Sequence, residues 1–203
     1  MTRVATIDSP NSGIVVYDEI LRPDFQKALL AFLKGPGWSY GAYSDASPNP
    51  SLYWYKHFAG VTRDNAEAVD SAGFEGDLKR NAPIVSELWT ALKQGLMRGH
   101  ELTRCYANGY PVGAEAGLHQ DAASDTHSTA IYYPHLDWHA NYAGETVFFT
   151  PEGSDIIRSV YPRPNRLVVF PGTIPHVARP ITSRCPHLRI TLMFKTVRAA
   201  SPI

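Results

Sequence analysis

The chain changes character at residues 102–133, LTRCYANGYPVGAEAGLHQDAASDTHSTAIYY, where short β-prone runs begin to alternate with turn residues. The alternation continues to residue 197, and it predicts strands over 102–106, 128–133, 145–149, 156–161, 167–170, 177–181 and 189–197. A dense series of short strands is typical of a β-sandwich or barrel. We therefore expect a mainly β fold with a jelly-roll-like core.

The first hundred residues have a different texture. Short strands are expected over 13–17 and 52–58, and the stretch 38–50 reads as a loop rich in Gly, Ser, Asp and Pro. Pro23 opens one helix and Gly35 closes it. A second helix is expected from Pro83 to about Gly99, with core residues at helical spacing: Ile84, Leu88, Leu92 and Leu96. Helices first and strands later indicate one α+β domain over 1–203, with a helical and lid region at 1–100 and a β core at 101–198.

Composition excludes several classes of protein. A hydrophobic fraction of 44% can build a core, and the longest apolar run, residues 28–33, is far shorter than the roughly 20 residues of a membrane helix. The chain carries 19 basic and 19 acidic side chains, so neither nucleic acid nor an acidic membrane is an expected partner. With no secretory signal at its start, the protein is expected in the cytoplasm, and its oligomeric state stays open.

A metal site is indicated by His119 and Asp121, with His176 far downstream. In an extended segment, residues i and i+2 point to the same face, so the first two can aim their side chains at one point. A third ligand from a distant strand would complete one face of an octahedron. Two histidines and one carboxylate on one face form the triad of non-haem Fe(II) oxygenases.

The stretch 102–195 resembles the 2-oxoglutarate- and Fe(II)-dependent dioxygenases, nearest to their prolyl-hydroxylase-like branch. Besides His119 and Asp121, the resemblance rests on ordered blocks: RCYANGY at 104–110, IYY at 131–133 with DW at 137–138, GET at 144–146, PNRLVVF at 164–170 and HVARP at 176–180. One glycine of the family's Gly-Gly strand start is replaced by Ala143. The first hundred residues show no such resemblance.

The resemblance implies a double-stranded β-helix that uses Fe(II), with 2-oxoglutarate and O2 as cosubstrates and ascorbate as a candidate reductant. Its cosubstrate needs a cation for the far carboxylate, because a guanidinium pairs with a carboxylate through two hydrogen bonds. In the family, this cation is an arginine at a set spacing after the last histidine of the triad. In this chain Cys185 occupies that position. We favour Arg189, which opens an apolar strand, over Arg184 as the alternative.

Further site residues follow from the resemblance and from strand alternation. Tyr106 and Tyr133 match tyrosines that help to hold 2-oxoglutarate. Alternation places Thr129 with Tyr133 on one pocket wall, and Thr191 beside the candidate arginine. Residues expected to contact substrate lie in aromatic segments that could roof the site: Trp54, His57, Trp38 and Trp138.

The function expected is hydroxylation of an unactivated C–H bond in a small molecule, such as an amino acid or a natural product. A peptidyl, prolyl-type protein hydroxylase is the alternative within the family. Asp121 argues against halogenation, in which a small residue replaces the carboxylate, whereas desaturation and ring closure stay open. Two alternatives of other classes are a cupin-like metalloprotein without 2-oxoglutarate and a non-catalytic β-barrel binding module.

Overall fold

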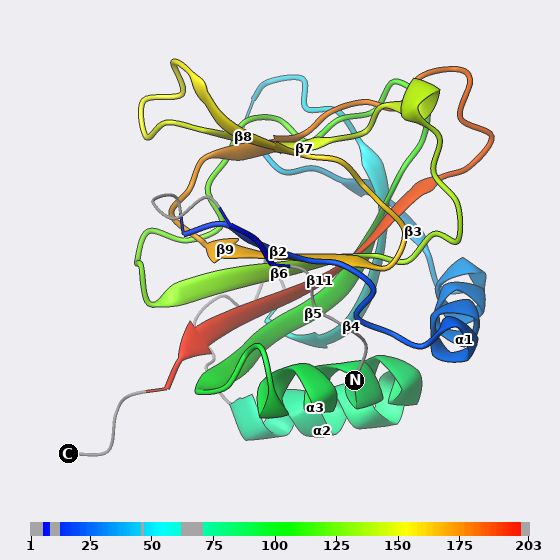
Figure 1. The fold of residues 1–203 in the computed structure, drawn as a ribbon, viewed down its shortest axis with the longest axis vertical. Coiled ribbons are helices and arrows are strands. Elements are labelled where there is room, and N and C mark those ends of the chain that lie inside the picture. The colour runs from blue at the N-terminus through cyan, green and yellow to red at the C-terminus, as the bar shows by residue number, and fades with distance from the viewer. Residues whose placement is uncertain (1–5, 9–12, 46, 62–70, 200–203) are drawn as a thin grey trace.

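The computed structural model describes residues 6–8, 13–45, 47–61 and 71–199. Eight strands form one sheet in the order β1-β2-β9-β6-β11-β5-β4-β3, and three form a smaller sheet in the order β10-β7-β8 (Figure 1). The large sheet comprises β1 (Thr6–Asp8), β2 (Val15–Tyr17), β3 (Ser39–Ala42), β4 (Tyr53–Gly60), β5 (His100–Tyr110), β6 (His127–Tyr133), β9 (Arg166–Pro171) and β11 (Arg189–Arg198). The small sheet comprises β7 (Thr146–Phe149), β8 (Ile156–Val160) and β10 (His176–Ala178).

The two sheets face each other and enclose the barrel interior (Figure 1). Side chains from both sheets meet there, including Ile131 and Phe170 of the large sheet and Phe148 of the small one. The rings of Phe148 and Phe170 pack edge to face at 4.8 Å. This mainly β architecture is the double-stranded β-helix expected from the sequence, and all seven predicted strands after residue 100 are confirmed to within a few residues.

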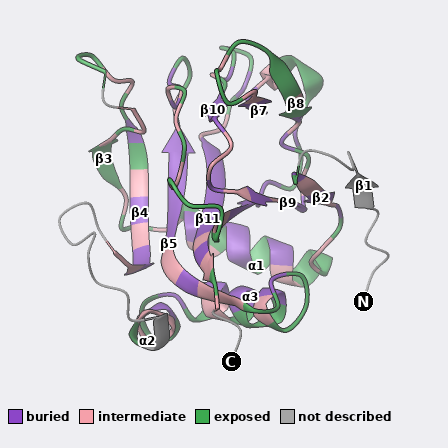
Figure 2. Ribbon diagram, turned by 90° about the vertical axis from the view of Figure 1, so that its left-hand side faces the viewer, coloured by how far each residue is buried: buried purple, intermediate pink, exposed green. Residues whose placement is uncertain are grey.

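Three helices cover the outer face of the large sheet (Figure 1). They are α1 (Pro23–Lys34), α2 (Ser71–Asn81) and α3 (Pro83–Gln94). Proline begins α1 and α3, where its missing N–H costs no hydrogen bond, and glycine follows each of these two helices. Each helix turns an apolar face to the sheet (Figure 2); Trp89 of α3 stacks on Phe194 of β11 at 5.6 Å. Leu96 is an exception to the prediction, because α3 ends at Gln94 and leaves this side chain 37% exposed.

The strands expected at 13–17 and 52–58 are present as β2 and β4, and the first hundred residues also supply two strands that were not expected, β1 and β3; all four join the large sheet. The expected loop at 38–50 contains β3, an exposed edge strand that pairs only with β4. A buried ion pair also holds the N-terminal segment against the barrel. Asp18, just after β2, accepts hydrogen bonds from Nε and Nη2 of Arg166 at 2.7 and 2.9 Å.

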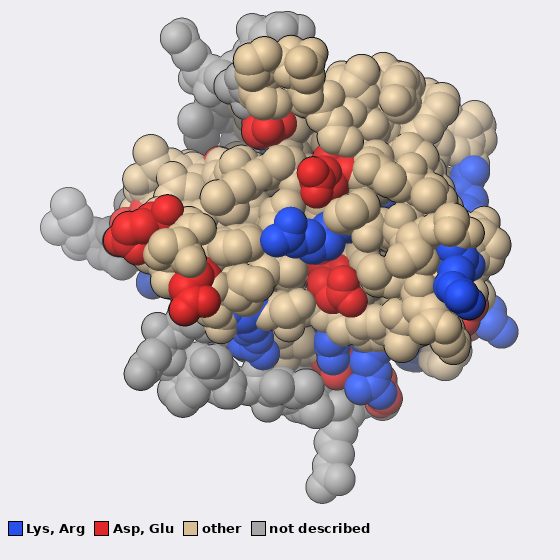
Figure 3. Space-filling view, turned by 90° about the horizontal axis from the view of Figure 1, so that it is seen from above, with Lys and Arg blue, Asp and Glu red and all other residues tan. Residues whose placement is uncertain are grey.

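Opposite charges meet within the barrel. Residues 101–155 carry eight acidic side chains and one basic one, whereas residues 156–203 carry eight basic side chains and no acidic one. Strands of the second stretch pair with strands of the first: β11 with β5 and β6, β9 with β6, and β8 and β10 with β7. Basic and acidic side chains are accordingly interspersed on the face shown in Figure 3. In the described part of the chain, no helix is long and apolar enough to cross a membrane.

Candidate functional site

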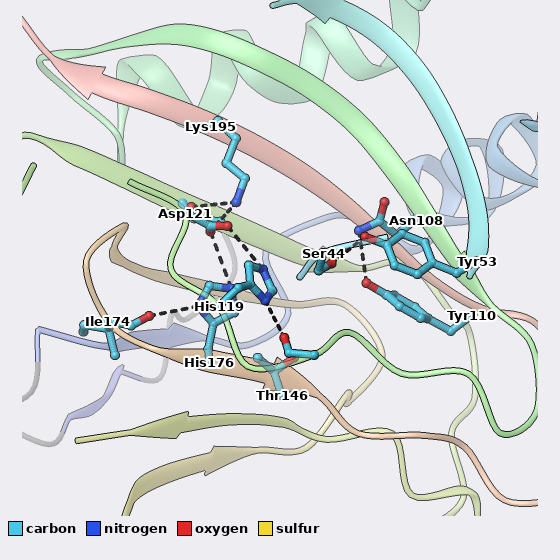
Figure 4. Close-up of polar contacts among 12 residues, drawn as sticks. Ser44, Tyr53, Asn108, Tyr110, His119, Asp121, Thr146, Ile174, His176 and Lys195 are labelled. Atoms are coloured by element: carbon cyan, nitrogen blue, oxygen red, sulfur yellow. Dashed lines mark hydrogen bonds and ion pairs between the residues drawn. The ribbon is translucent and has the colours of Figure 1, made fainter. Parts of the chain in front are cut away.

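Two histidines and one aspartate from distant parts of the chain meet at one point (Figure 4). His119 and Asp121 lie between β5 and β6, and His176 is the first residue of β10. An isolated antiparallel bridge joins the two histidines. The N–H of His119 donates to the carbonyl of His176 at 3.1 Å, and the reverse bond measures 2.9 Å. This bridge holds the two imidazoles on the same side, with ring centroids 4.4 Å apart.

The geometry of the three side chains suits one divalent cation. Their ligand atoms lie within 4.8 Å of one another, and each histidine Nε2 is 3.5 Å from an oxygen of Asp121. The Nδ1 atom of His119 bonds the carbonyl of Gly117 at 2.7 Å, and that of His176 bonds the carbonyl of Ile174 at 2.9 Å. Because a carbonyl can only accept, Nδ1 carries the proton and Nε2 keeps a free lone pair. Burial also lowers the pKa of His176 to about 4, so this imidazole is neutral.

Asp121 is held as a carboxylate by its neighbours. The Thr129 hydroxyl donates to Oδ2 at 2.6 Å, and the Lys195 ammonium contacts the same oxygen (Figure 4). Burial alone would raise the pKa of Asp121, but the ammonium of Lys195 beside it holds the pKa well below its usual value. Since both partners engage Oδ2, the other carboxylate oxygen, Oδ1, is left free beside Nε2 of His119.

A small cavity leads from the triad to a buried cation. Arg189 is 1% exposed, and its Nε donates to the carbonyl of Gly144 at 2.6 Å while Nη2 donates to Thr146 Oγ1 at 3.1 Å. Gly144 has φ +84°, and a Cβ there would lie 2.8 Å from the Ile181 side chain. Among the described residues, no carboxylate pairs with this guanidinium. A buried cation of this kind needs an anion, and a narrow cavity lies between it and the triad.

A second, larger cavity opens on the other side of the triad. Its volume is about 890 Å³, and it is lined by β3, β4, β5 and the ends of β6 and β11 as well as by His119 and Asp121. The two cavities therefore meet at the triad. A bound metal ion would contact a ligand in the small cavity and a second molecule in the large one.

Comparison with known proteins identifies this arrangement. Residues 105–195, which contain the triad and Arg189, match the family described as the 2OG-Fe(II) oxygenase superfamily. The chain belongs to this superfamily. As an oxygenase of this family it uses Fe(II), 2-oxoglutarate and O2. This result favours the dioxygenase over the cupin-like and the non-catalytic alternatives.

Solved structures share the fold over most of the chain. A Pseudomonas putida prolyl-4-hydroxylase is 20% identical with a TM-score of 0.57, covering 93% of this chain and 94% of the other. An oxidoreductase of the 2OG-Fe(II) oxygenase family from Burkholderia pseudomallei is 18% identical with a TM-score of 0.65, covering 93% and 87%. HygX from Streptomyces hygroscopicus, with nickel and 2-oxoglutarate bound, is 10% identical with a TM-score of 0.57, covering 92% and 83%. No curated protein matches the sequence.

The residues expected to hold 2-oxoglutarate lie in two places. Arg189, Tyr106 and Thr191 line the small cavity of the oxygenase. Tyr133 lies at its far end, where its hydroxyl is 2.7 Å from Thr146 Oγ1 and its ring centroid is 5.8 Å from the Arg189 guanidinium. Thr129, as described, bonds Asp121 instead. Arg184 is exposed on a turn, so the structure places Arg189 and not this alternative at the cavity.

Of the four residues expected to contact substrate, His57 alone lines the large cavity. The three tryptophans lie elsewhere, and for them the prediction does not agree with the structure. Trp54 alternates with His57 on β4 and points to the opposite face. Trp38 donates to the carbonyl of Leu33 at 2.9 Å, and Trp138 donates to that of Ala143 at the same distance.

Several cavity residues escaped the sequence analysis. Tyr53 and Tyr55 share the face of His57 on β4, and Arg104 shares the face of Tyr106 on β5. Strand alternation from the two residues already identified would have found all three. Further cavity residues that the sequence analysis did not single out are Ser44, Asn108, Thr146 and Lys195.

Proposed function

We propose that this oxygenase hydroxylates an unactivated C–H bond of a small molecule, such as an amino acid or a natural product. His119, Asp121 and His176 would bind the Fe(II), and Arg189 would bind the far carboxylate of 2-oxoglutarate. The observation that carries the proposal is the position of Arg189, a buried and unpaired cation that shares one cavity with the triad.

The donor set fits Fe(II). Two neutral imidazole nitrogens and one carboxylate oxygen on one side of a cation leave the opposite side open to other ligands. When bound, the iron supplies with O2 the oxidising chemistry that converts a substrate C–H to C–OH as 2-oxoglutarate becomes succinate and CO2. Arg189 orients the cosubstrate, because its planar guanidinium binds a carboxylate through paired hydrogen bonds in a site that excludes water.

Thr129 and Lys195 act as positioning residues for Asp121. Both engage Oδ2, which restrains rotation of the carboxylate and keeps it beside the two histidines. Lys195 also donates to Thr129 Oγ1 at 3.1 Å, which closes a three-residue network. Partners of this kind fix the orientation of a ligand and tune its affinity for metal.

The large cavity supports a small substrate. Its volume of about 890 Å³ lies within the roughly 300–1,000 Å³ usual for sites that enclose small molecules. Three side chains of β4, those of Tyr53, Tyr55 and His57, form one wall of this cavity. A substrate there would contact their aromatic rings and would also reach the triad, because His119 and Asp121 line the same cavity.

The experiment is succinate formation by purified protein with Fe(II) and 2-oxoglutarate, alone and with a panel of metabolites and peptides. We expect Fe(II)-dependent succinate, increased by a small molecule that gains one oxygen atom. His176→Ala should abolish it, while His139→Ala, at an exposed histidine, should not. A peptide that alone is hydroxylated would refute the choice of substrate class. Succinate formed equally well by His176→Ala would refute the metal assignment.

Two broader proposals accompany this function. Residues 1–203 form one domain, supported by the large sheet, to which strands from both halves of the chain contribute. The protein resides in the cytoplasm, supported by Cys105 and Cys185, which are buried free thiols of the kind that a reducing compartment preserves.

A further inference from the structure

Arg104 is a second cation without a carboxylate partner, and it faces the large cavity. Its guanidinium carbon lies 4.4 Å from the ring centroid of Tyr106 and 5.6 Å from that of Tyr55. One hydrogen bond leaves it, from Nη2 to the Tyr55 hydroxyl at 3.3 Å. Its Nε is buried without any hydrogen-bond partner, and no carboxylate in the described part of the chain forms an ion pair with it.

The register of the sheet places this cation beside the triad. Arg104 of β5 is directly opposite Lys195 of β11, and Lys195 contacts Asp121. Side chains that are opposite each other on antiparallel strands start about 5 Å apart. A group bound by Arg104 would therefore lie within about two side-chain lengths of the metal position.

Among the described residues that line this wall, Arg104 supplies the free positive charge. The ammonium of Lys195 is already paired with Asp121. Burial and the charge of Arg104 lower the pKa of His57, so its imidazole is neutral, and its Nδ1 is 2.8 Å from the Tyr55 hydroxyl. One uncompensated charge matches a carboxylate, whereas a phosphate dianion would require a second free cation. The planar guanidinium lies against two neighbouring tyrosine rings, and its shape suits paired hydrogen bonds with a carboxylate.

We propose that Arg104 binds a carboxylate of the substrate, so that the substrate class is small carboxylic acids. The proposal rests on the proposed function, because it places the oxidised carbon of the acid at the triad. A short acid, such as a free amino acid or hydroxy acid, spans the distance between Arg104 and the metal position. An internal residue of a peptide has no α-carboxylate to offer.

The test measures binding apart from turnover. Protein loaded with Mn(II) and 2-oxoglutarate is mixed with pairs of probes, each a free amino or hydroxy acid with its primary amide, and binding is followed by saturation-transfer NMR. We expect at least one acid to bind more than about 10-fold tighter than its amide, because the amide lacks the charge. Arg104→Gln should remove that preference, and Arg104→Lys should restore part of it. The matched control is Arg98→Gln, at an exposed arginine that bonds only the carbonyl of Gln94.

Three results would overturn the inference. Acids that bind no better than their amides would exclude a carboxylate site in the cavity. Arg104→Gln with the acid affinities of the wild type would place the site elsewhere. Loss of 2-oxoglutarate binding in Arg104→Gln but not in Arg189→Gln would assign Arg104 to the cosubstrate. Failure of the proposed function would give a different result. Fe(II)-dependent succinate formation would then be absent, while acids would still bind to the wild type and not to Arg104→Gln.

Discussion

Replacing Arg189 with Met tests which residue holds 2-oxoglutarate. The guanidinium is 1% exposed and has no carboxylate partner among the described residues, so its pairing with the cosubstrate would take place out of water. Truncating one partner of a buried, hydrogen-bonded charge pair costs about 2–5 kcal/mol. Because about 1.4 kcal/mol corresponds to a factor of 10, we expect 2-oxoglutarate affinity to fall about 30-fold to 4,000-fold.

Thermal unfolding gives a convenient assay. With Mn(II) in place of Fe(II), and 2-oxoglutarate at 100 times the wild-type Kd, binding stabilises the folded protein by about 2.7 kcal/mol. A 30-fold weaker Kd leaves about 0.9 kcal/mol at the same concentration. For a domain of this size about 1 kcal/mol shifts Tm by roughly 2–4 °C. The wild type should therefore gain roughly 5–11 °C, and Arg189→Met at most roughly 2–4 °C.

The matched control is Arg184→Met, at the alternative arginine on the exposed turn. It should show the full wild-type gain. Arg189→Met that still gains the wild-type shift would refute the assignment of Arg189, whatever its effect on the protein without ligand. Loss of the shift in Arg184→Met alone would show that the turn moves this side chain into the cavity.

Three further changes probe the metal site and the fold. His176→Ala should weaken Mn(II) binding, measured by calorimetry, by more than about 100-fold, whereas His139→Ala should leave it unchanged. Asp18→Asn should cost about 3–5 kcal/mol in urea unfolding at pH 7, because it leaves Arg166 buried without its partner. The hydrogen bond from Arg166 lowers the pKa of Asp18 below 3.8, so in the wild type this stability is present above that pH and is lost as pH falls through the folded-state pKa. Burial lowers the pKa of His135 from 6.5 to about 3, so the free energy of unfolding should fall by up to about 1.4 kcal/mol per pH unit from pH 6.5 towards 3. His135→Gln should flatten that slope, because glutamine does not titrate and can still accept the hydrogen bond that the Ile190 N–H donates to His135 Nε2.

The strands of the barrel could be predicted because short β-prone runs are separated by turn residues. The edge strand β3 could not, since Ser39–Ala42 has exposed and intermediate positions and no apolar face. In the described part of the chain it pairs with β4 alone, and its residues carry no pattern that predicts this pairing. Strands of the first hundred residues were not expected to join the large sheet, because their partners β5 and β9 lie much farther along the chain.

The triad and Arg189 could be named from the sequence, because ligand spacing and the start of an apolar strand are local patterns. The tryptophans were misplaced for the opposite reason. Aromatic residues suit a cavity wall and a core equally well, and only the direction of the side chain decides between them. Arg104 was overlooked although it shares a face with Tyr106, which was named. On the same strand, a register shift near residue 103 places Leu102 in the core between the large sheet and the helices.

The positions of these residues separate the reaction from the choice of substrate. Residues 105–195, the part that matches the superfamily, contain the triad, Thr129, Lys195 and Arg189, which we propose to serve the metal and 2-oxoglutarate. β3 and β4, which lie outside that match, form one wall of the large cavity, and Arg104 directly precedes the match. Substitutions on β4 should therefore change which acid is bound while 2-oxoglutarate affinity stays constant, and substitutions at Arg189 should do the reverse. A β4 variant such as Tyr55→Phe that changed both affinities together would show that the two cavities are not independent.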